Sequence, residues 1–160
     1  MKKKMLLALD DSPCAMKAVE YTGHQFSEAA DLQLTLVHVL PNLPAIFWDE
    51  GHILSDDEKK ERRKVVDTWL SKQKQKIEPV MQSAVKVLVR HGIKAESIMK
   101  KFISDSTDVA KSILEEARDG GCQTIVLGRC GIAEGKHLLL GSVTSKVIQL
   151  GAKIAVCIVE

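Results

Sequence analysis

The sequence lacks an excess of charge of either sign. Its 160 residues include 23 Lys and Arg against 21 Asp and Glu, which leaves a formal net charge of +2. A nucleic-acid groove or a polybasic membrane patch needs a concentration of positive charge that this mixed balance does not indicate. We therefore expect neither nucleic acid nor a membrane as a partner.

The sequence also lacks a long apolar run. Three lysines precede the apolar residues 5–9, as in a signal peptide, but Asp10 and Asp11 end the run and no Ala-x-Ala cleavage site follows. No run approaches the roughly 20 apolar residues that span a bilayer. These absences predict a chain without a secretion signal or a membrane span.

Cysteines are few and widely scattered, at Cys14, Cys122, Cys130 and Cys157. None forms a CxxC pair, and no histidine stands at a spacing typical of a zinc site. We expect a reduced, soluble, cytoplasmic protein.

Strand and helix patterns alternate along a chain of the length of one domain, 1–160. Short apolar runs predict strands at 5–9, 34–40, 97–103, 124–127 and 153–159. Amphipathic stretches predict helices at 13–30, from the capping box at Ser55 to the stop at Gly92, from Ser106 or Thr107 to 118, and at 141–150. The alternation predicts an α/β fold with a parallel sheet covered on both faces.

Several local signals refine this prediction. Ser12 followed by Pro13 is a good start for the first helix, and Pro79 should bend or split the long one. Lys100 and Lys101 suit an exposed edge strand. The loop 41–55, which begins with a cluster of prolines, is interpreted as a lid or a partner surface.

Ligands of parallel α/β sheets bind at the carboxyl ends of strands where the strand order reverses. Here those ends are Asp10 and Gly128. Because adjacent side chains diverge, we expect Asp10 to face the cleft and Asp11 to cap a helix or meet solvent.

A glycine-rich segment follows the fourth predicted strand. It reads Gly128-Arg129-Cys130-Gly131, then nine residues, then Gly141-Ser142-Val143-Thr144 at the start of a helix. Glycines allow close backbone approach to an anion, and the helix start offers N–H groups, a favourable dipole and hydroxyl donors. The spacing favours phosphate binding. The spacing alone does not distinguish a nucleotide ligand from a sugar phosphate. A glycine-rich surface loop that binds no ligand and precedes a helix cap is also compatible with it.

This segment resembles the nucleotide-binding signature of the universal stress protein family. The resemblance extends over the whole chain through the opening residues 5–12, the Val37-His38-Val39 strand end and residues 107–110. It implies a three-layer α/β/α, Rossmann-like nucleotide-binding fold with a five-stranded sheet of order 3-2-1-4-5. It also implies a homodimer paired through the C-terminal strand.

The resemblance further implies a set of ATP-binding residues. Ala8, Leu9, Asp10 and Val39 would surround the adenine, and Gly128 and Gly131 would border the ribose and phosphates. Gly141, Ser142, Val143 and Thr144 would donate to the phosphate chain, and Leu127 and Arg129 complete the set without an assigned contact. Mg would be held through the ATP phosphates rather than by side chains. The function implied is that of a nucleotide-dependent stress-response module.

Phosphoryl transfer needs an aligned nucleophile, a metal and a positioning base. We recognise no such set of catalytic residues beside the glycine-rich segment. We expect a binding module with at most slow ATP hydrolysis. The alternative is a nucleotide-free homodimeric interaction module of the same fold. The five histidines and both tryptophans are interpreted as surface or packing residues. The Arg129-Cys130 pair departs from the family pattern, and we hypothesise that Cys14 or Cys130 tunes nucleotide binding.

Overall fold

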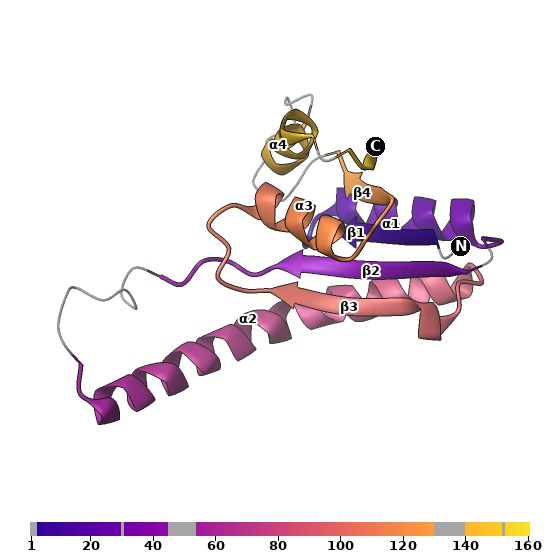
Figure 1. Cartoon of the computed structure of the whole chain (residues 1–160). Helices are drawn as coiled ribbons and strands as arrows, with labels where there is room; N and C mark the ends of the chain where they lie inside the picture. The colour runs from indigo at the N-terminus through magenta and orange to yellow at the C-terminus, as the bar shows by residue number, and fades with distance from the viewer. Residues whose placement is uncertain (1–2, 30, 45–53, 130–139, 152) are drawn as a thin grey trace.

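Five parallel strands form a single sheet in the order β3-β2-β1-β4-β5 (Figure 1). The computed structural model describes residues 3–29, 31–44, 54–129, 140–151 and 153–160. The strands are β1 (Lys3–Ala8), β2 (Leu32–Val39), β3 (Ile98–Ile103), β4 (Thr124–Gly128) and β5 (Ala155–Val159). This confirms the predicted sheet and its order. The order reverses between β1 and β4, which lie side by side although helices and two strands separate them in the chain.

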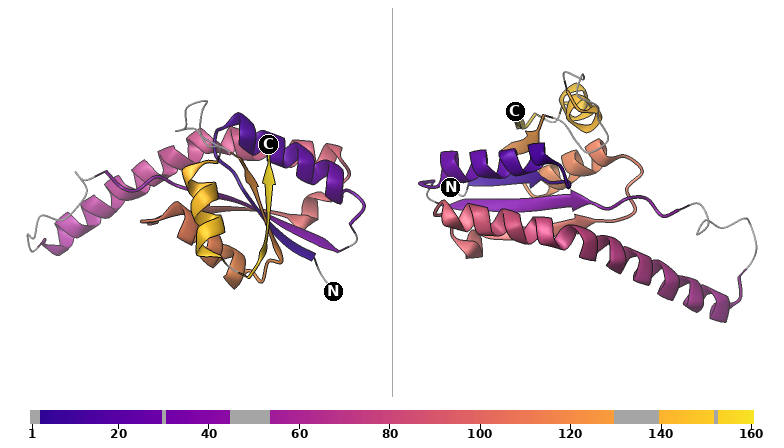
Figure 2. Two further views of the ribbon diagram at one scale, coloured as in Figure 1. Left: turned by 90° about the horizontal axis from the view of Figure 1, so that it is seen from above. Right: turned by 180° about the vertical axis from the view of Figure 1, so that it is seen from behind.

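Helices cover both faces of the sheet (Figure 2). One apolar cluster joins α1 (Pro13–Phe26) and α2 (Asp56–Arg90) to one face, and a second joins α3 (Val109–Asp119) and α4 (Ser142–Leu150) to the other. Side chains alternate between these clusters along β1, where Leu7 belongs to the first and Leu6 to the second. Burial on both faces explains why the strands are continuous apolar runs.

The helix starts follow side-chain capping. The Ser12 hydroxyl accepts a bond from the Ala15 N–H at the start of α1, and Ser55 and Glu58 form the predicted capping box of α2. The prediction was wrong for α3, where Asp108 rather than Ser106 or Thr107 is the N-cap and accepts from the Lys111 N–H. The Ser106 hydroxyl instead bonds to that of Ser112 at 2.7 Å.

Two predicted helix features differ from the structure. Helix α1 ends at Phe26 rather than near residue 30. Helix α2 is not split at Pro79 but continues for 35 residues. Only its second half carries buried side chains, namely Ile77, Met81, Ala84 and Leu88, and its first half projects beyond the sheet (Figures 1 and 2). The packing of the residues on either side of Pro79 holds the helix together where one backbone hydrogen bond is lost.

A short 3-10 turn, η2 (Ala95–Ser97), connects α2 to β3. Strand β3 lies at the sheet edge with Lys100 and Lys101 exposed, as predicted. Residues 45–53 of the proposed lid lie outside the described residues. In the part of the chain that the structure describes, no helix is long and apolar enough to cross a membrane.

Candidate functional site

The carboxyl ends of β1, β2 and β4 meet at one edge of the sheet. Leu7 is paired with Val126 of β4 and with Leu36 of β2, so that the residues following each strand come together there. The Leu9 N–H extends the pairing by donating to the Val37 carbonyl at 2.8 Å. The predicted residues Ala8, Leu9 and Asp10 therefore lie between Val39 on one side and the Leu127-Gly128 end of β4 on the other.

A cavity of about 400 Å³ opens at this edge. Its described lining comes from the ends of β1, β2 and β3, the second half of α2 and the start of α3: Asp11, His38, Val39, Leu40, Pro41, Asn42, Gln73, Lys76, Ile77, Ser106, Thr107 and Val109. Val39 is the predicted site residue among them. The volume lies within the range of pockets that hold small molecules, and the mixture of apolar walls with a few polar groups is typical of them.

His38 is a lining residue that sequence reasoning assigned to packing. Its Nδ1 donates a hydrogen bond of 2.7 Å to the Leu9 carbonyl, because a carbonyl oxygen can only accept. In the neutral ring this bond places the proton on Nδ1 and leaves Nε2 as a hydrogen-bond acceptor. The bond also ties the end of β2 to the end of β1. The sequence signal that could have placed His38 at the site was its position at the end of a strand. Its spacing to the other histidines carried no such information.

The two neighbouring aspartates differ from expectation in which side chain lines the cavity, although Asp11 is exposed as predicted. Asp11 lines the cavity, whereas Asp10 accepts hydrogen bonds from both the N–H and the hydroxyl of Ser12. The Ser12 hydroxyl in turn caps α1 by accepting from Ala15. The Asp10 carboxylate thus fixes the turn between β1 and α1.

Gly128 lies where the last residue of β4 passes the first turn of α1. A Cβ built on it would come within 2.7 Å of the backbone carbon and oxygen of Cys14. The absent side chain therefore points toward α1, and the immediate need for glycine is close packing of strand against helix. The sequence argument had attributed this need to ligand approach.

The two halves of the glycine segment are joined by hydrogen bonds. The Gly141 N–H donates to the Arg129 carbonyl at 2.8 Å, and the Thr144 hydroxyl donates to the Gly128 carbonyl at 2.9 Å. These bonds occupy two of the donors that the sequence had assigned to phosphate. They also hold the start of α4 against the end of β4, where the amides of the first helical turn have no carbonyl partner one turn earlier. At this helix start Ser142 is exposed, Val143 is half-buried and Thr144 is buried.

Charges near the site are mostly paired. Arg129 forms an ion pair with Glu160, with 3.3 Å between Nε and Oε1. Asp108, beside the cavity-lining Thr107 and Val109, pairs with Lys146 of α4 at 2.6 Å. The hydrogen bond from Lys146 is the main reason that the pKa of Asp108 lies below its usual value. This pair links α3 to α4 on the side of the sheet that carries the glycine segment.

The cysteines are not all reduced, contrary to expectation. Cys14 is disulfide-bonded, while Cys122 and Cys157 are the free thiols among the described residues. Cys122 is buried, and burial raises its pKa. Cys130 and Gly131, which the sequence singled out, lie outside the described residues.

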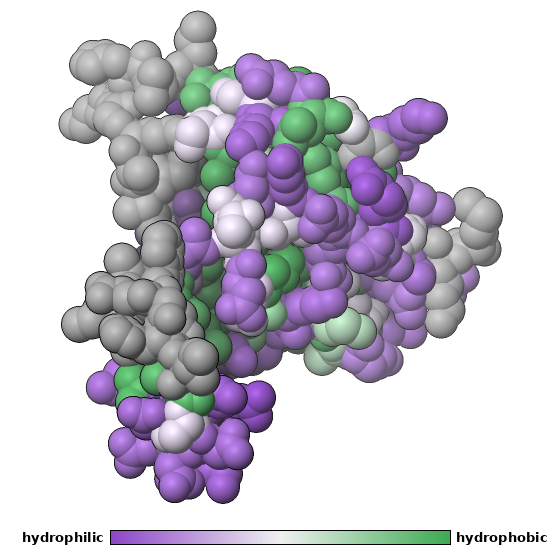
Figure 3. All heavy atoms as spheres, turned by 60° about the vertical axis from the view of Figure 1, so that its left-hand side comes forward, coloured by the Kyte–Doolittle hydropathy of each residue, from purple (hydrophilic) through white to green (hydrophobic). Residues whose placement is uncertain are grey.

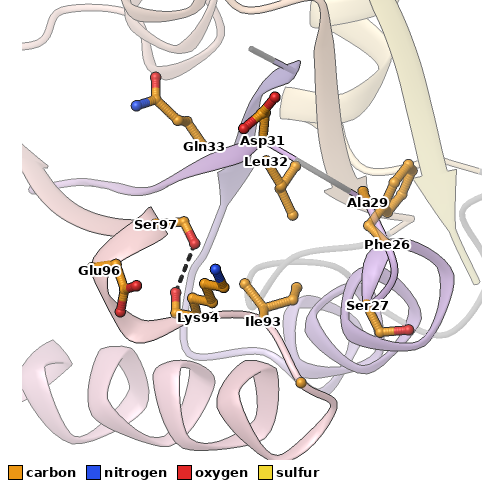
Figure 4. Close-up of a pocket in the computed structure, with 11 residues that line it drawn as sticks. Phe26, Ser27, Ala29, Asp31, Leu32, Gln33, Ile93, Lys94, Glu96 and Ser97 are labelled. Atoms are coloured by element: carbon orange, nitrogen blue, oxygen red, sulfur yellow. Dashed lines mark hydrogen bonds between the residues drawn. The ribbon is translucent and has the colours of Figure 1, made fainter.

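A second cavity, of about 450 Å³, lies at the opposite edge of the sheet. Figure 4 shows its lining from the end of α1, the start of β2 and the turn after α2, with the Ser97 hydroxyl bonded to the Lys94 carbonyl at 2.8 Å. Because it faces the amino ends of the strands, it is remote from the glycine segment.

The fold defines a class: a doubly wound α/β protein with a cavity and a glycine-flanked helix start at the carboxyl edge of its sheet. The model of the universal stress protein family matches residues 1–159. The chain belongs to this family.

Individual relatives agree with that assignment. The chain is 29% identical to the universal stress protein YxiE of Bacillus subtilis (strain 168), with 94% of each chain covered. It matches the solved structure of protein MJ0577 with a TM-score of 0.74, 24% identity and 99% and 96% of the two chains covered.

Two further solved structures are complexes with adenine nucleotides. A universal stress protein in complex with cAMP matches with a TM-score of 0.61, 16% identity and 99% and 96% coverage. An Arabidopsis thaliana family protein with AMP bound matches with a TM-score of 0.60, 15% identity and 98% and 90% coverage. At these identities the likeness shows the fold.

Proposed function

We propose that this protein is an ATP-binding regulatory module of the stress response. The observation that carries the proposal is the start of α4, hydrogen-bonded onto the end of β4 by Gly141 and Thr144 at the same sheet edge as the cavity. A helix start favours anions through its amides and its dipole. The AMP and cAMP complexes of relatives support an adenine nucleotide over a sugar phosphate.

In this proposal the base contacts the backbone of residues 8–10 and the side chain of Val39. The ribose and phosphates pass Leu127, Gly128, Arg129 and Gly131, and the phosphate chain ends at residues 141–144. In this proposal the amides of Val143 and Thr144 donate to the phosphates, because the Gly141 N–H and the Thr144 hydroxyl already hold the two segments together.

Magnesium fits the proposal only as a partner of the phosphates. No group of three or more His, Cys, Asp or Glu side chains that could hold a metal occurs within the described ranges. Mg bound between phosphate oxygens would neutralise part of their charge. Among the described residues, those proposed to bind the phosphates are not accompanied by a positioned general base. We therefore expect ATP hydrolysis to be slow at most.

Binding is tested with ATP and Mg by calorimetry and by thermal unfolding. At about 100 times its dissociation constant a ligand stabilises the folded state by roughly 2.7 kcal/mol, which raises the melting temperature by about 5–10 °C for a chain of this size. The same samples are assayed for phosphate release, which separates a binder from an ATPase.

The variant Ser142→Asp sharpens this test. A carboxylate in the first turn of α4 interacts favourably with the helix dipole, so the protein without ligand stays folded, but it repels the phosphates. We expect the affinity for ATP to fall at least about tenfold, which at the same ligand concentration lowers the stabilisation from roughly 2.7 to about 1.4 kcal/mol and halves the thermal shift. Gln149→Glu adds the same charge at the exposed other end of α4 and should leave the shift intact. A wild-type protein whose melting temperature does not respond to ATP would overturn the proposal and favour the nucleotide-free module.

A further inference from the structure

The small net charge of the chain conceals a separation of charge between two parts of the molecule. Residues 59–76 of α2, which follow its acidic first turn Asp56–Glu58, carry eight Lys or Arg and two acidic residues, a net charge of +6. The remainder of the chain therefore carries −4. We call residues 59–76 the basic arm.

Most of the basic arm stands away from the core, and only its last turn, with Gln73 and Lys76, reaches the cavity at the sheet edge. Its residues are exposed or half-buried, and the first fully packed side chain of α2 is Ile77, after the arm ends. Figure 3 shows the start of α2 as a projection that is largely hydrophilic with small hydrophobic areas. A helix of this length is only marginally stable in water by itself, so a surface that contacts the arm would stabilise it.

Basic and apolar side chains form adjacent rows along the arm. Lys64, Thr68 and Lys72 follow one another at intervals of four, and Val65 and Trp69 form the neighbouring row. These five residues line a groove of about 310 Å³. Val65 is 49% exposed, although it is apolar. The groove thus has an apolar floor bordered by two ammonium groups.

We propose that the basic arm docks onto an anionic lipid surface, with Lys64 and Lys72 at the headgroup phosphates and Val65 and Trp69 at the boundary with the acyl chains. A helix with Lys and Arg on its polar face and Trp with aliphatic residues on the other has the composition of interfacial helices. Nucleic acid would be recognised by the charges alone and would leave the Val65–Trp69 row unused. The row therefore favours lipid.

The acidic residues at the beginning of α2 do not oppose this docking. Glu58 accepts hydrogen bonds from the N–H and hydroxyl of Ser55, and these bonds lower its pKa. Asp56 lies 3.7 Å from Lys59. Their charges are directed at the helix N-terminus, which they stabilise.

The test measures sedimentation of the full chain with vesicles of phosphatidylglycerol and phosphatidylcholine in about a 1:2 ratio, against phosphatidylcholine alone. We expect binding to the anionic vesicles, and loss of it at roughly 0.5 M salt, where the Debye length falls to a few ångströms. In a Trp48→Phe background Trp69 is the remaining tryptophan. Its emission should shift to the blue on anionic vesicles, as an indole does when it leaves water.

Matched variants separate docking from general electrostatics. Each lysine near an anionic surface contributes about fivefold in affinity, so Lys64→Gln with Lys72→Gln should weaken vesicle binding roughly 25-fold. Lys17→Gln with Lys86→Gln removes the same charge from exposed positions outside the arm and should change binding less than about twofold. Equal losses in both double variants, or equal binding to neutral vesicles, would overturn the proposal. Binding to duplex DNA without binding to vesicles would also overturn it and assign the arm to nucleic acid.

Discussion

At the scale of single residues, glycine serves packing as much as ligand approach. The Cβ positions built on Gly128 and Gly23 both come within 2.7 Å of another atom, but the partners differ. Gly128 would meet the backbone of Cys14, which the first turn of α1 fixes. Gly23 would meet the ring of His91, which can rotate away.

This difference predicts unequal costs for two equal substitutions. Gly128→Ala should lower the free energy of unfolding by about 1–3 kcal/mol, as overpacking of a fixed interior does. Gly23→Ala should cost less, because the ring can move and alanine favours the helix by up to about 1 kcal/mol. Urea unfolding of both variants measures the two costs. Equal destabilisation would show that the close approach of β4 to α1 can relax.

At the site, the roles of some residues could be predicted from the sequence and those of others could not. Val39 could be placed at the cavity because strand ends converge in any parallel sheet. The place of Asp11 rather than Asp10 at the cavity could not be predicted, because it depends on the Ser12 hydroxyl bonding back to Asp10 while also capping α1. The bond from His38 to Leu9 likewise joins residues 29 positions apart, which no local pattern encodes.

At the scale of elements, periodicity predicted each strand and helix, and the errors lie at their ends. Three candidate caps stand in a row before α3, and Asp108 is the one whose carboxylate reaches the Lys111 N–H while it pairs with Lys146. The second contact is tertiary, so the cap could not be chosen from sequence. Pro79 does not split α2 for the same reason, since packing of Ile77 and Met81 outweighs the lost hydrogen bond.

Helix α2 is joined to the edge strand β3 by a hydrogen-bonded ion pair between Glu78 and Lys100. The bond from Lys100 is the main cause that lowers the pKa of Glu78 from the ordinary value of 4.5. A carboxyl with a lower pKa in the folded state binds its proton more weakly there than in the unfolded chain. Its contribution to stability is therefore present above pH 4.5 and is lost as the pH falls through the lower, folded value.

Glu78→Gln should accordingly flatten the pH dependence of stability below pH 4.5. The change at neutral pH should stay under about 1 kcal/mol, because both side chains are about one-third exposed. Urea midpoints between roughly pH 3 and 7 measure the slope. Gln82→Glu would be a poor control because Gln82 also bonds to Glu78. Glu96→Gln, at an exposed position within η2, is preferred. A variant as sensitive to acid as the wild type would exclude Glu78 as a source of the slope.

At the scale of the whole molecule, the two sheet edges differ in chemistry. The β3 edge carries Lys100 and Lys101, which pair with glutamates of α2 and α3. The β5 edge reads Ala-Val-Cys-Ile-Val without a charge or a proline. Charged residues on edge strands discourage pairing with other chains, and β5 has none. The large apolar side chains exposed at or near this edge are Tyr21, Ile148, Leu150 and Ile158.

This asymmetry supports the proposed homodimer through β5 and makes it testable. Ile158→Lys places a charge on the edge strand at a position that is already 36% exposed, so the fold should tolerate it while a paired second strand would bury the ammonium group. We expect the wild type to elute with the mass of a dimer in size-exclusion chromatography with light scattering, and Ile158→Lys to elute as a monomer.

The control variant is Val89→Lys, which replaces an apolar residue of similar exposure on α2 and should remain dimeric. A monomeric wild type at about 100 times the concentration used for nucleotide binding would contradict the dimer.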